Sequence, residues 1–191
     1  MQIITPLIIF SLVIFSPLSF AFDDDRKGFL IGLGLGFQKT NIDATNANTP
    51  NDSETGLATS FKVGGGITEQ FSLYYVRSAS WFNAPYSEGS NTSDIYYSSG
   101  LSGLGASYYF QKNTPSGYIT GAFGIGDFAA PLEDDIDADT GSAFMVGGGY
   151  EIDKHIQLEI TYLRTSIDSK TFNESDFKTS SLQLSLNYLW Y

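Results

Sequence analysis

The residues best suited to chemistry are carboxylates gathered in one polar stretch, Asp127–Gly141. Within it, Asp135, Asp137 and Asp139 alternate with other residues, as the first ligands of an EF-hand calcium loop do. The glycine that such a loop needs comes one place late, and Val146 stands where the closing glutamate would be. A formed EF-hand is therefore excluded. Two interpretations stay open: a carboxylate cluster that binds Ca²⁺ or Mg²⁺ weakly through oxygen ligands, or a solvated acidic loop.

The chain offers no arrangement typical of a hydrolase. Its single histidine, His155, follows Asp153 and Lys154 at an expected turn, and no serine and carboxylate are placed to use it as a base. Cysteine is absent, which excludes a thiol nucleophile, a thiolate metal site and disulfides. The net charge of −11 excludes a basic surface for nucleic acid. We therefore expect no catalytic residues and no cofactor beyond a weakly bound divalent cation.

The segments that would position these residues alternate in polarity. In Ser181–Tyr191 the large apolar side chains recur at every second residue, which is the period of a β-strand rather than of a helix. In Phe29–Gln38 one face is large and apolar, and the other is mostly glycine. A soluble carrier of the lipocalin kind would place its large apolar side chains inside. Here the small face must be the crowded inside, which is typical of a transmembrane barrel.

Eight segments show this alternation to different degrees: Phe29–Gln38, Leu57–Ile67, Phe71–Trp81, Ile95–Phe110, Tyr118–Phe128, Ser142–Ile152, Ile156–Thr165 and Ser181–Tyr191. Strands of about ten residues are long enough to cross a bilayer when tilted. Only a closed barrel pairs every backbone group of such strands in lipid. We therefore predict that the first and last segments pair. The following residues are expected to face lipid: Phe29, Leu33, Leu35, Leu158, Ile160, Leu184 and Leu186.

The connections between these segments alternate between short turns and long polar stretches. The long ones are Lys39–Gly56, Phe82–Asp94, Asp127–Gly141 and Ser166–Lys178, and together they carry as much charge as the whole chain, −11. Short turns on one side and long loops on the other describe an all-β fold, an eight-stranded antiparallel up-and-down transmembrane β-barrel. Alternation in the fourth segment changes parity between Leu101 and Leu104, which predicts a bulge there.

The small faces of these strands also carry polar side chains. Lys62 and Glu159 both fall on the inward side, as do Gln157 and Asn187. An eight-stranded barrel is just wide enough for side chains to fill it, so charges inside it must pair. These four residues form either an interior polar network that plugs the lumen or the lining of a narrow ion path.

Two arginines follow tyrosines at the same spacing, in Tyr75-Val76-Arg77 and Tyr162-Leu163-Arg164. Both lie near the outer ends of their strands, and Arg164 shares the parity of the lipid-facing side chains. An arginine just beyond an interfacial tyrosine is placed to contact lipopolysaccharide phosphates, which its planar fork suits. The alternatives are snorkelling and a salt bridge within the loops, and both stay open.

The first residues point to secretion. Residues 3–20 are almost wholly apolar, and Ser19-Phe20-Ala21 offers small side chains at a cleavage site before a charged segment. This predicts a signal peptide over residues 1–21 and a barrel domain over residues 22–191. Met1-Gln2 lacks the usual lysine or arginine. A retained membrane anchor is the alternative, and Pro6 and Pro17 argue against it.

Two segments resemble a known family. Gly148–Ile167 resembles the last hairpin of small eight-stranded outer-membrane barrels of the OmpX/OmpA type, within the broad outer-membrane β-barrel domain family. Asn187-Tyr188-Leu189-Trp190 is similar to their C-terminal signature, although Tyr191 extends past the usual terminal aromatic.

The resemblance implies a place in the bacterial outer membrane, among lipid and lipopolysaccharide. It also implies recognition of the C-terminal strand by the barrel-assembly machinery. The expected role is non-enzymatic, either envelope-structural or adhesin-like, with surface partners contacted through the four acidic loops. A small porin or ion channel is the alternative function.

Overall fold

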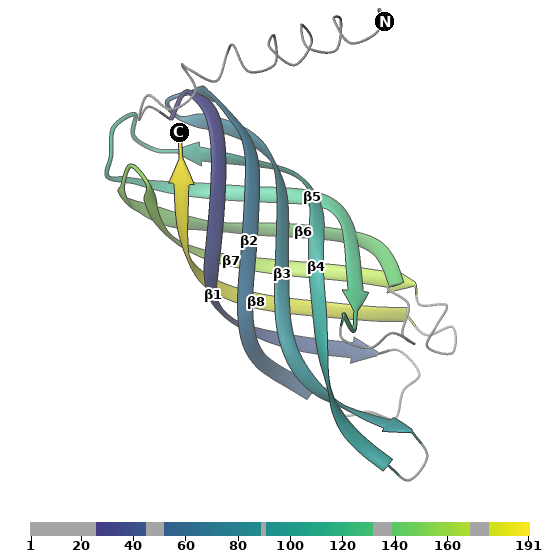
Figure 1. Ribbon diagram of the computed structural model, residues 1–191. Helices are drawn as coiled ribbons and strands as arrows, with labels where there is room; N and C mark the ends of the chain where they lie inside the picture. The colour runs from purple at the N-terminus through teal and green to yellow at the C-terminus, as the bar shows by residue number, and fades with distance from the viewer. Residues whose placement is uncertain (1–25, 45–51, 89–90, 132–138, 169–175) are drawn as a thin grey trace, which may run out of the picture.

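The computed structural model describes residues 26–44, 52–88, 91–131, 139–168 and 176–191, which form eight strands. The strands are β1 (Gly28–Ala44), β2 (Asp52–Thr68), β3 (Phe71–Glu88), β4 (Asn91–Tyr109), β5 (Ser116–Ala129), β6 (Asp139–Asp153), β7 (Ile156–Asp168) and β8 (Asp176–Trp190). Each strand pairs antiparallel with the next, and β8 pairs with β1, so the sheet closes into a tilted barrel (Figure 1). The predicted eight-stranded antiparallel barrel is confirmed. The predicted signal peptide lies outside the described residues.

No helix in the described ranges is both long enough and apolar enough to cross a bilayer.

The closing contact joins the two ends of the chain. β1 and β8 pair from Ile31 opposite Trp190 to Ala44 opposite Phe177, so the predicted pairing of the first and last segments is confirmed. Within β8, side chains alternate strictly between exposed and buried along residues 181–190. The structure places all seven of the predicted lipid-facing side chains on the outer face, Phe29 being half-buried there. The large apolar side chains of these strands therefore cover the outside of the barrel.

Glycine allows the strands to approach closely on the inside. A Cβ added to Gly36 would lie 1.9 Å from the carbonyl oxygen of Leu184 and 2.6 Å from the Cα of Ser185. No side chain fits at that distance, so a larger residue at this position would push β1 and β8 apart. The nearly empty face of β1 is therefore a requirement of barrel closure.

We call the end of the barrel with short connections the turn end and the other the loop end. At the turn end, β2 and β3 are joined through Glu69 and Gln70. β6 and β7 are joined through Lys154 and His155, at the turn that was expected there. The chain also enters β1 and leaves β8 at this end (Figure 1).

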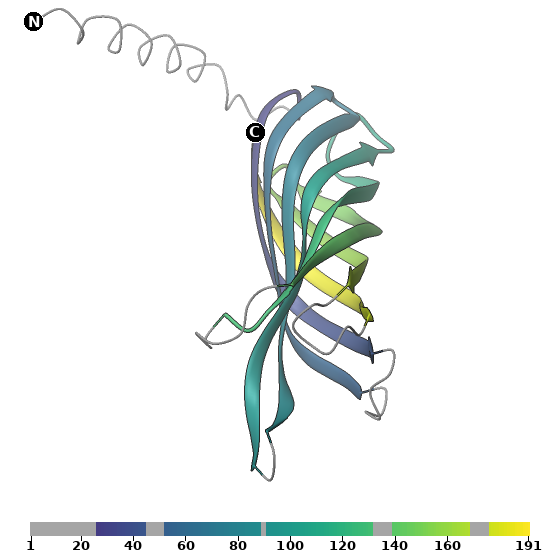
Figure 2. The ribbon, with the colours of Figure 1, turned by 90° about the vertical axis from the view of Figure 1, so that its right-hand side faces the viewer.

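The four connections at the loop end span fewer residues than the sequence predicted. Strands extend into all four, and the β3–β4 pairing continues to Glu88 opposite Asn91, so this hairpin projects beyond its neighbours (Figure 2). Outside the bilayer both faces of a strand meet water. Alternation of polar and apolar side chains then disappears while backbone pairing continues, and the sequence pattern no longer marks a strand.

The bulge predicted in β4 is also wrong. β4 pairs with β3 and β5 without a register shift, with Leu101 fully buried inside and Leu104 exposed outside. Two residues three places apart lie on opposite faces of a regular strand. The two register shifts within the described pairings occur between Gly66 and Thr68 and between Glu151 and Asp153, both beside turns.

Candidate functional site

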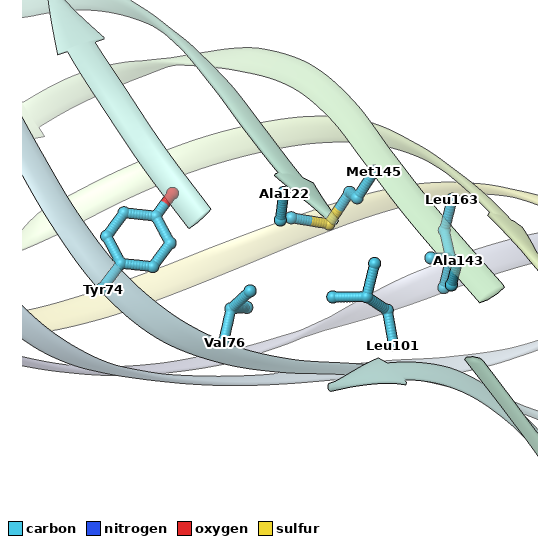
Figure 3. Packing of buried hydrophobic residues seen from close by; sticks show 7 residues of the cluster. All are labelled: Tyr74, Val76, Leu101, Ala122, Ala143, Met145 and Leu163. Atoms are coloured by element: carbon cyan, nitrogen blue, oxygen red, sulfur yellow. The ribbon is translucent and has the colours of Figure 1, made fainter. Parts of the chain in front are cut away.

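An apolar layer crosses the middle of the barrel. It is a cluster of buried side chains from β3 to β7: Tyr74, Val76, Leu101, Ala122, Ala143, Met145 and Leu163. Side chains from opposite walls point toward one another (Figure 3). Val76, Leu101 and Leu163 are 0% exposed and Met145 is 2% exposed. A layer of this kind fills the lumen and offers an ion nothing to replace its hydration.

A buried ion pair lies on the turn-end side of this layer. The Lys62 Nζ lies 2.7 Å from the Glu159 Oε2, and each side chain is 3% exposed. The Tyr118 hydroxyl donates a second hydrogen bond to the same oxygen, at 2.9 Å. The ammonium of Lys62 also lies 5.5 Å from the centre of the Tyr74 ring. The two charges are therefore paired inside the barrel, and one carboxylate oxygen accepts two hydrogen bonds.

The other two polar residues assigned to the interior also lie inside it. The Gln157 Nε2 donates to the hydroxyl of Tyr109 at 2.8 Å and to that of Tyr191 at 3.3 Å. The Asn187 Oδ1 accepts from the Ser60 hydroxyl at 2.9 Å. Gln157 lies near the turn end, and Asn187 joins a smaller group with Ser185, so the four residues belong to more than one contact group.

Beside the apolar layer, on the wall formed by β8, Gln183 organises a hydroxyl network. Its Oε1 accepts from Ser78 at 3.0 Å and from Thr161 at 3.1 Å, while its Nε2 donates to Ser80 at 3.0 Å. All of the hydrogen-bonding groups of this amide side chain thus face partners from opposite walls. Gln183 was on the inner face of the last predicted strand, but its partners depend on a register that one strand alone does not reveal.

A second apolar cluster closes the loop end. Its buried members come from β3, β4, β5 and β7 and from the residue that follows β5: Phe82, Ile95, Tyr97, Phe128, Ala130 and Ile167. The Tyr97 and Phe128 rings stack with their centroids 5.2 Å apart. Phe82 had been placed in a polar loop, and the structure instead turns it into the barrel.

The turn end is closed by Arg26, which the sequence did not single out. Its Nε lies 3.0 Å from both carboxylate oxygens of Glu151, and its Nη2 also contacts this carboxylate. Its Nη1 donates to the carbonyl oxygens of Glu69, Gln111 and Lys112, at 2.8–3.0 Å. The guanidinium carbon lies 4.4 Å from the centre of the Tyr109 ring.

One side chain thus binds two turns and strand β6. Burial alone would lower the pKa of Arg26, but the hydrogen bonds and charge of Glu151 outweigh it and raise the pKa. The guanidinium is therefore held charged across the mouth of the turn end. In the sequence, Arg26 belonged to a charged run next to the predicted cleavage site, which gave no signal of its inward position.

The two arginines with the shared spacing are not brought together. Arg77 points outward from β3, where its Nη2 lies 2.7 Å from the Asp127 Oδ2 on β5 and its Nη1 lies 3.2 Å from the Ser102 hydroxyl on β4. Arg164 is exposed on β7 and has no ion-pair partner among the described residues. Of these two arginines, only Arg164 therefore presents an unpaired charge on the outer face.

The acidic stretch gives no metal site that the structure can describe. Asp135 and Asp137 lie outside the described residues, and Asp139 is the half-buried first residue of β6. Across the described ranges, no group of three or more histidine, cysteine or acidic side chains could hold a metal ion. His155 lies at a turn, with its Nδ1 2.8 Å from the Leu189 carbonyl oxygen and its ring stacked on Tyr188. Weak calcium binding by Asp135, Asp137 and Asp139 stays a prediction.

Comparison with known proteins agrees with this architecture. No curated protein matches the chain. Among solved structures, it is similar to Ail, the attachment invasion locus protein of Yersinia pestis, crystallised with the heparin analogue sucrose octasulfate. That match has 11% identity and a TM-score of 0.52, over 85% of this chain and 99% of Ail.

Two further solved structures show the same likeness. Neisserial surface protein A matches with 13% identity and a TM-score of 0.54, over 85% of this chain and 96% of that protein. The outer membrane protein OprG of Pseudomonas aeruginosa matches with 14% identity and a TM-score of 0.50, over 88% and 99%. At such identities the likeness concerns the fold alone.

The family comparison covers nearly the whole chain. A family model described as the outer membrane protein beta-barrel domain matches residues 8–189. This agrees with the closed antiparallel barrel, its apolar outer face and its short and long ends. The chain belongs to the outer membrane protein β-barrel domain family and is a protein of the bacterial outer membrane.

Proposed function

We propose that this protein is a non-enzymatic, closed barrel that acts through its extracellular end, in an envelope-structural or adhesin-like role. The observation that carries the proposal is the filled interior. Arg26 covers the turn end, which is the periplasmic mouth of the barrel, and the apolar layer crosses the middle. The second apolar cluster, around Phe128, covers the loop end, which is the extracellular mouth. Because the lumen is filled at three levels, the loops and the outer surface are the parts of the barrel that can contact other molecules.

The acidic extracellular stretches favour a cationic partner. They hold most of the carboxylates of the chain, and exposed charges of one sign attract ligands of the other over about a Debye length of 8–10 Å. Ail was crystallised with a sulfated sugar, which is a polyanion. A polyanion suits this chain poorly, so we expect the surface partner to differ in charge.

A small ion channel is the second candidate. It is favoured by the polar groups that adjoin the apolar layer, such as the Lys62–Glu159 pair and the hydroxyls around Gln183. These groups are already paired with one another. An ion entering the barrel would have to break these contacts and also cross the apolar layer, where no partner replaces its water.

We also propose that residues 1–21 are removed as a signal peptide and that β8 is recognised by the barrel-assembly machinery. Trp190 and Tyr188 point outward, whereas the Tyr191 side chain is 1% exposed and lies inside. An outward aromatic is accessible to a partner before the barrel closes. This supports Trp190, rather than Tyr191, as the terminal aromatic that is recognised.

Planar-bilayer recordings test the closed lumen. The refolded wild-type protein should give no unitary conductance steps. The positive control is a variant that opens all three levels, in which Leu101→Ser, Met145→Ser and Leu163→Ser are combined with Arg26→Ala and Phe128→Ala. Regular wild-type steps whose size follows salt concentration, and which disappear when Lys62 is replaced by methionine, would establish the channel instead.

A further inference from the structure

The basic side chains of the outer face gather on one side of the extracellular end. Among the described residues, Arg26 and Lys62 are paired inside, Arg77 is paired with Asp127, and Lys27, Lys112 and Lys154 lie at the periplasmic end. The remaining three are Lys39 on β1, Arg164 on β7 and Lys178 on β8. These strands are consecutive around the barrel because β8 joins β7 to β1. None of the three has an ion-pair partner within the described part of the chain.

The strand register brings these three cations within reach of one another. Arg164 lies opposite Ser180, and Ser180 lies opposite Asn41. Lys178 lies two residues further out on β8, and Lys39 lies two residues further in on β1. With strands about 4.8 Å apart and about 3.3 Å per residue, the backbone of Arg164 lies roughly 8 Å from that of Lys178 and roughly 12 Å from that of Lys39. Long side chains at these spacings can contact one ligand together.

Lys39 and Arg164 lie at the border of the apolar belt, and Lys178 lies one outward position beyond Ser180 on β8. Along β1, Lys39 is the first outward side chain beyond Phe37, and along β7, Arg164 is the first beyond Tyr162. The Tyr162 hydroxyl also donates to the Ser180 hydroxyl at 3.1 Å, so a polar group lies between the charges. This border is the level at which lipid headgroups meet a barrel.

We propose that Lys39, Arg164 and Lys178 form a binding site for the phosphate groups of a phosphorylated glycolipid in the outer leaflet. The phosphates would contact the three cations, while the acyl chains lie along the leucines of β8. Arg77 is not part of this site, because Asp127 already neutralises it on another side of the barrel. Asp43 lies opposite Lys178, and Asp168 and Asp176 lie opposite each other on β7 and β8. These acidic residues lie further along their strands toward the loop end than Lys39 and Arg164 do, on the side away from the lipid. The site does not depend on whether the lumen conducts.

Native mass spectrometry of the full refolded protein tests this site. The probe is lipid A with two phosphates, compared with its dephosphorylated form and with inorganic phosphate. The wild-type protein should retain bisphosphorylated lipid A, and Lys39→Gln with Arg164→Gln and Lys178→Gln should weaken its binding at least tenfold. The dephosphorylated lipid should bind the wild-type protein no better than the bisphosphorylated lipid binds this variant.

The matched control is the charge-neutral change Arg77→Gln with Asp127→Asn, which should leave binding unchanged. The charge-conserving variant Lys39→Arg with Arg164→Lys and Lys178→Arg should bind like the wild type, which separates charge from folding. Three results would overturn the site. They are unchanged binding by the glutamine variant, equal loss in the Arg77 control, or competition by inorganic phosphate below millimolar concentration, which indicates a site for free phosphate.

Discussion

The buried pair of Lys62 and Glu159 makes the strongest prediction about the interior. Replacing one member of a buried ion pair costs about 3–5 kcal/mol, because the remaining charge loses its partner in a dry environment. Lys62→Met leaves the Glu159 carboxylate with the Tyr118 hydroxyl as its remaining hydrogen-bond donor. Glu159→Gln leaves the ammonium of Lys62 without a counter-charge. Each change should therefore lower the free energy of unfolding by about 3–5 kcal/mol, or roughly two to four powers of ten in the equilibrium constant.

The double variant Lys62→Met with Glu159→Met should be more stable than either single variant. Replacing a whole buried pair by apolar side chains is often neutral or stabilising, since both desolvation costs disappear. The Tyr118 hydroxyl then loses its acceptor, which costs about 1–3 kcal/mol. The single changes should therefore be strongly non-additive, with the double variant recovering most of the lost stability.

Reversible denaturant unfolding in lipid vesicles measures these differences, with the fluorescence of the two tryptophans as the signal. Lys112→Met is the control, because Lys112 is exposed in a turn and its loss should cost less than about 0.5 kcal/mol. Single-variant costs below about 1 kcal/mol that simply add in the double variant would refute the reasoning. They would mean that water reaches the pair and that the lumen is not dry.

Three further predictions concern Arg26 at the turn end, the pairing of β1 with β8, and the outward face of β1. Arg26→Ala should cost about 3–5 kcal/mol in the same unfolding assay, because Glu151 stays buried without its cation, yet bilayer recordings should remain silent since the apolar layer is intact. Gly36→Ala should cost about 1–3 kcal/mol through overpacking and reduce the yield of heat-modifiable barrel on gels, whereas Gly121→Ala, whose added Cβ would lie 3.7 Å from the nearest atom, should fold normally. Leu33→Lys should cost about 2–4 kcal/mol in vesicles, and a cost near zero would contradict the outward orientation of β1.

The sequence predicts this fold well where one face of a strand meets lipid. In β1 and β8 the contrast between large and small side chains is strong enough to reveal strand, face and closure. The contrast is weaker where the interior is itself apolar. Leu101 was taken as evidence for a bulge because the inner face was expected to be small or polar, but an apolar layer occupies the middle of the lumen.

The residues of the site were predictable as single positions but not as contacts. Parity placed Lys62 and Glu159 inside, but their 2.7 Å contact joins β2 to β7, across the barrel. Arg77 was expected near the outer end of its strand, but its partner Asp127 lies two strands away and had been assigned to a loop. Arg26 precedes the first strand, so strand alternation does not predict which way its side chain points. Contacts of this kind depend on strand register and barrel closure, which one strand's pattern does not contain.

The position of Arg26 has a consequence for the order of assembly. Its guanidinium needs the carbonyl oxygens of the β2–β3 and β4–β5 turns and a carboxylate from β6, which lie 43, 85 and 125 residues further along the chain. A chain whose strands are only partly paired has no place for this charge. Docking of the segment before β1 must therefore come late, after most of the later strands have taken their positions. The first charged residue of the described chain thus becomes a check that the periplasmic side of the barrel has been completed.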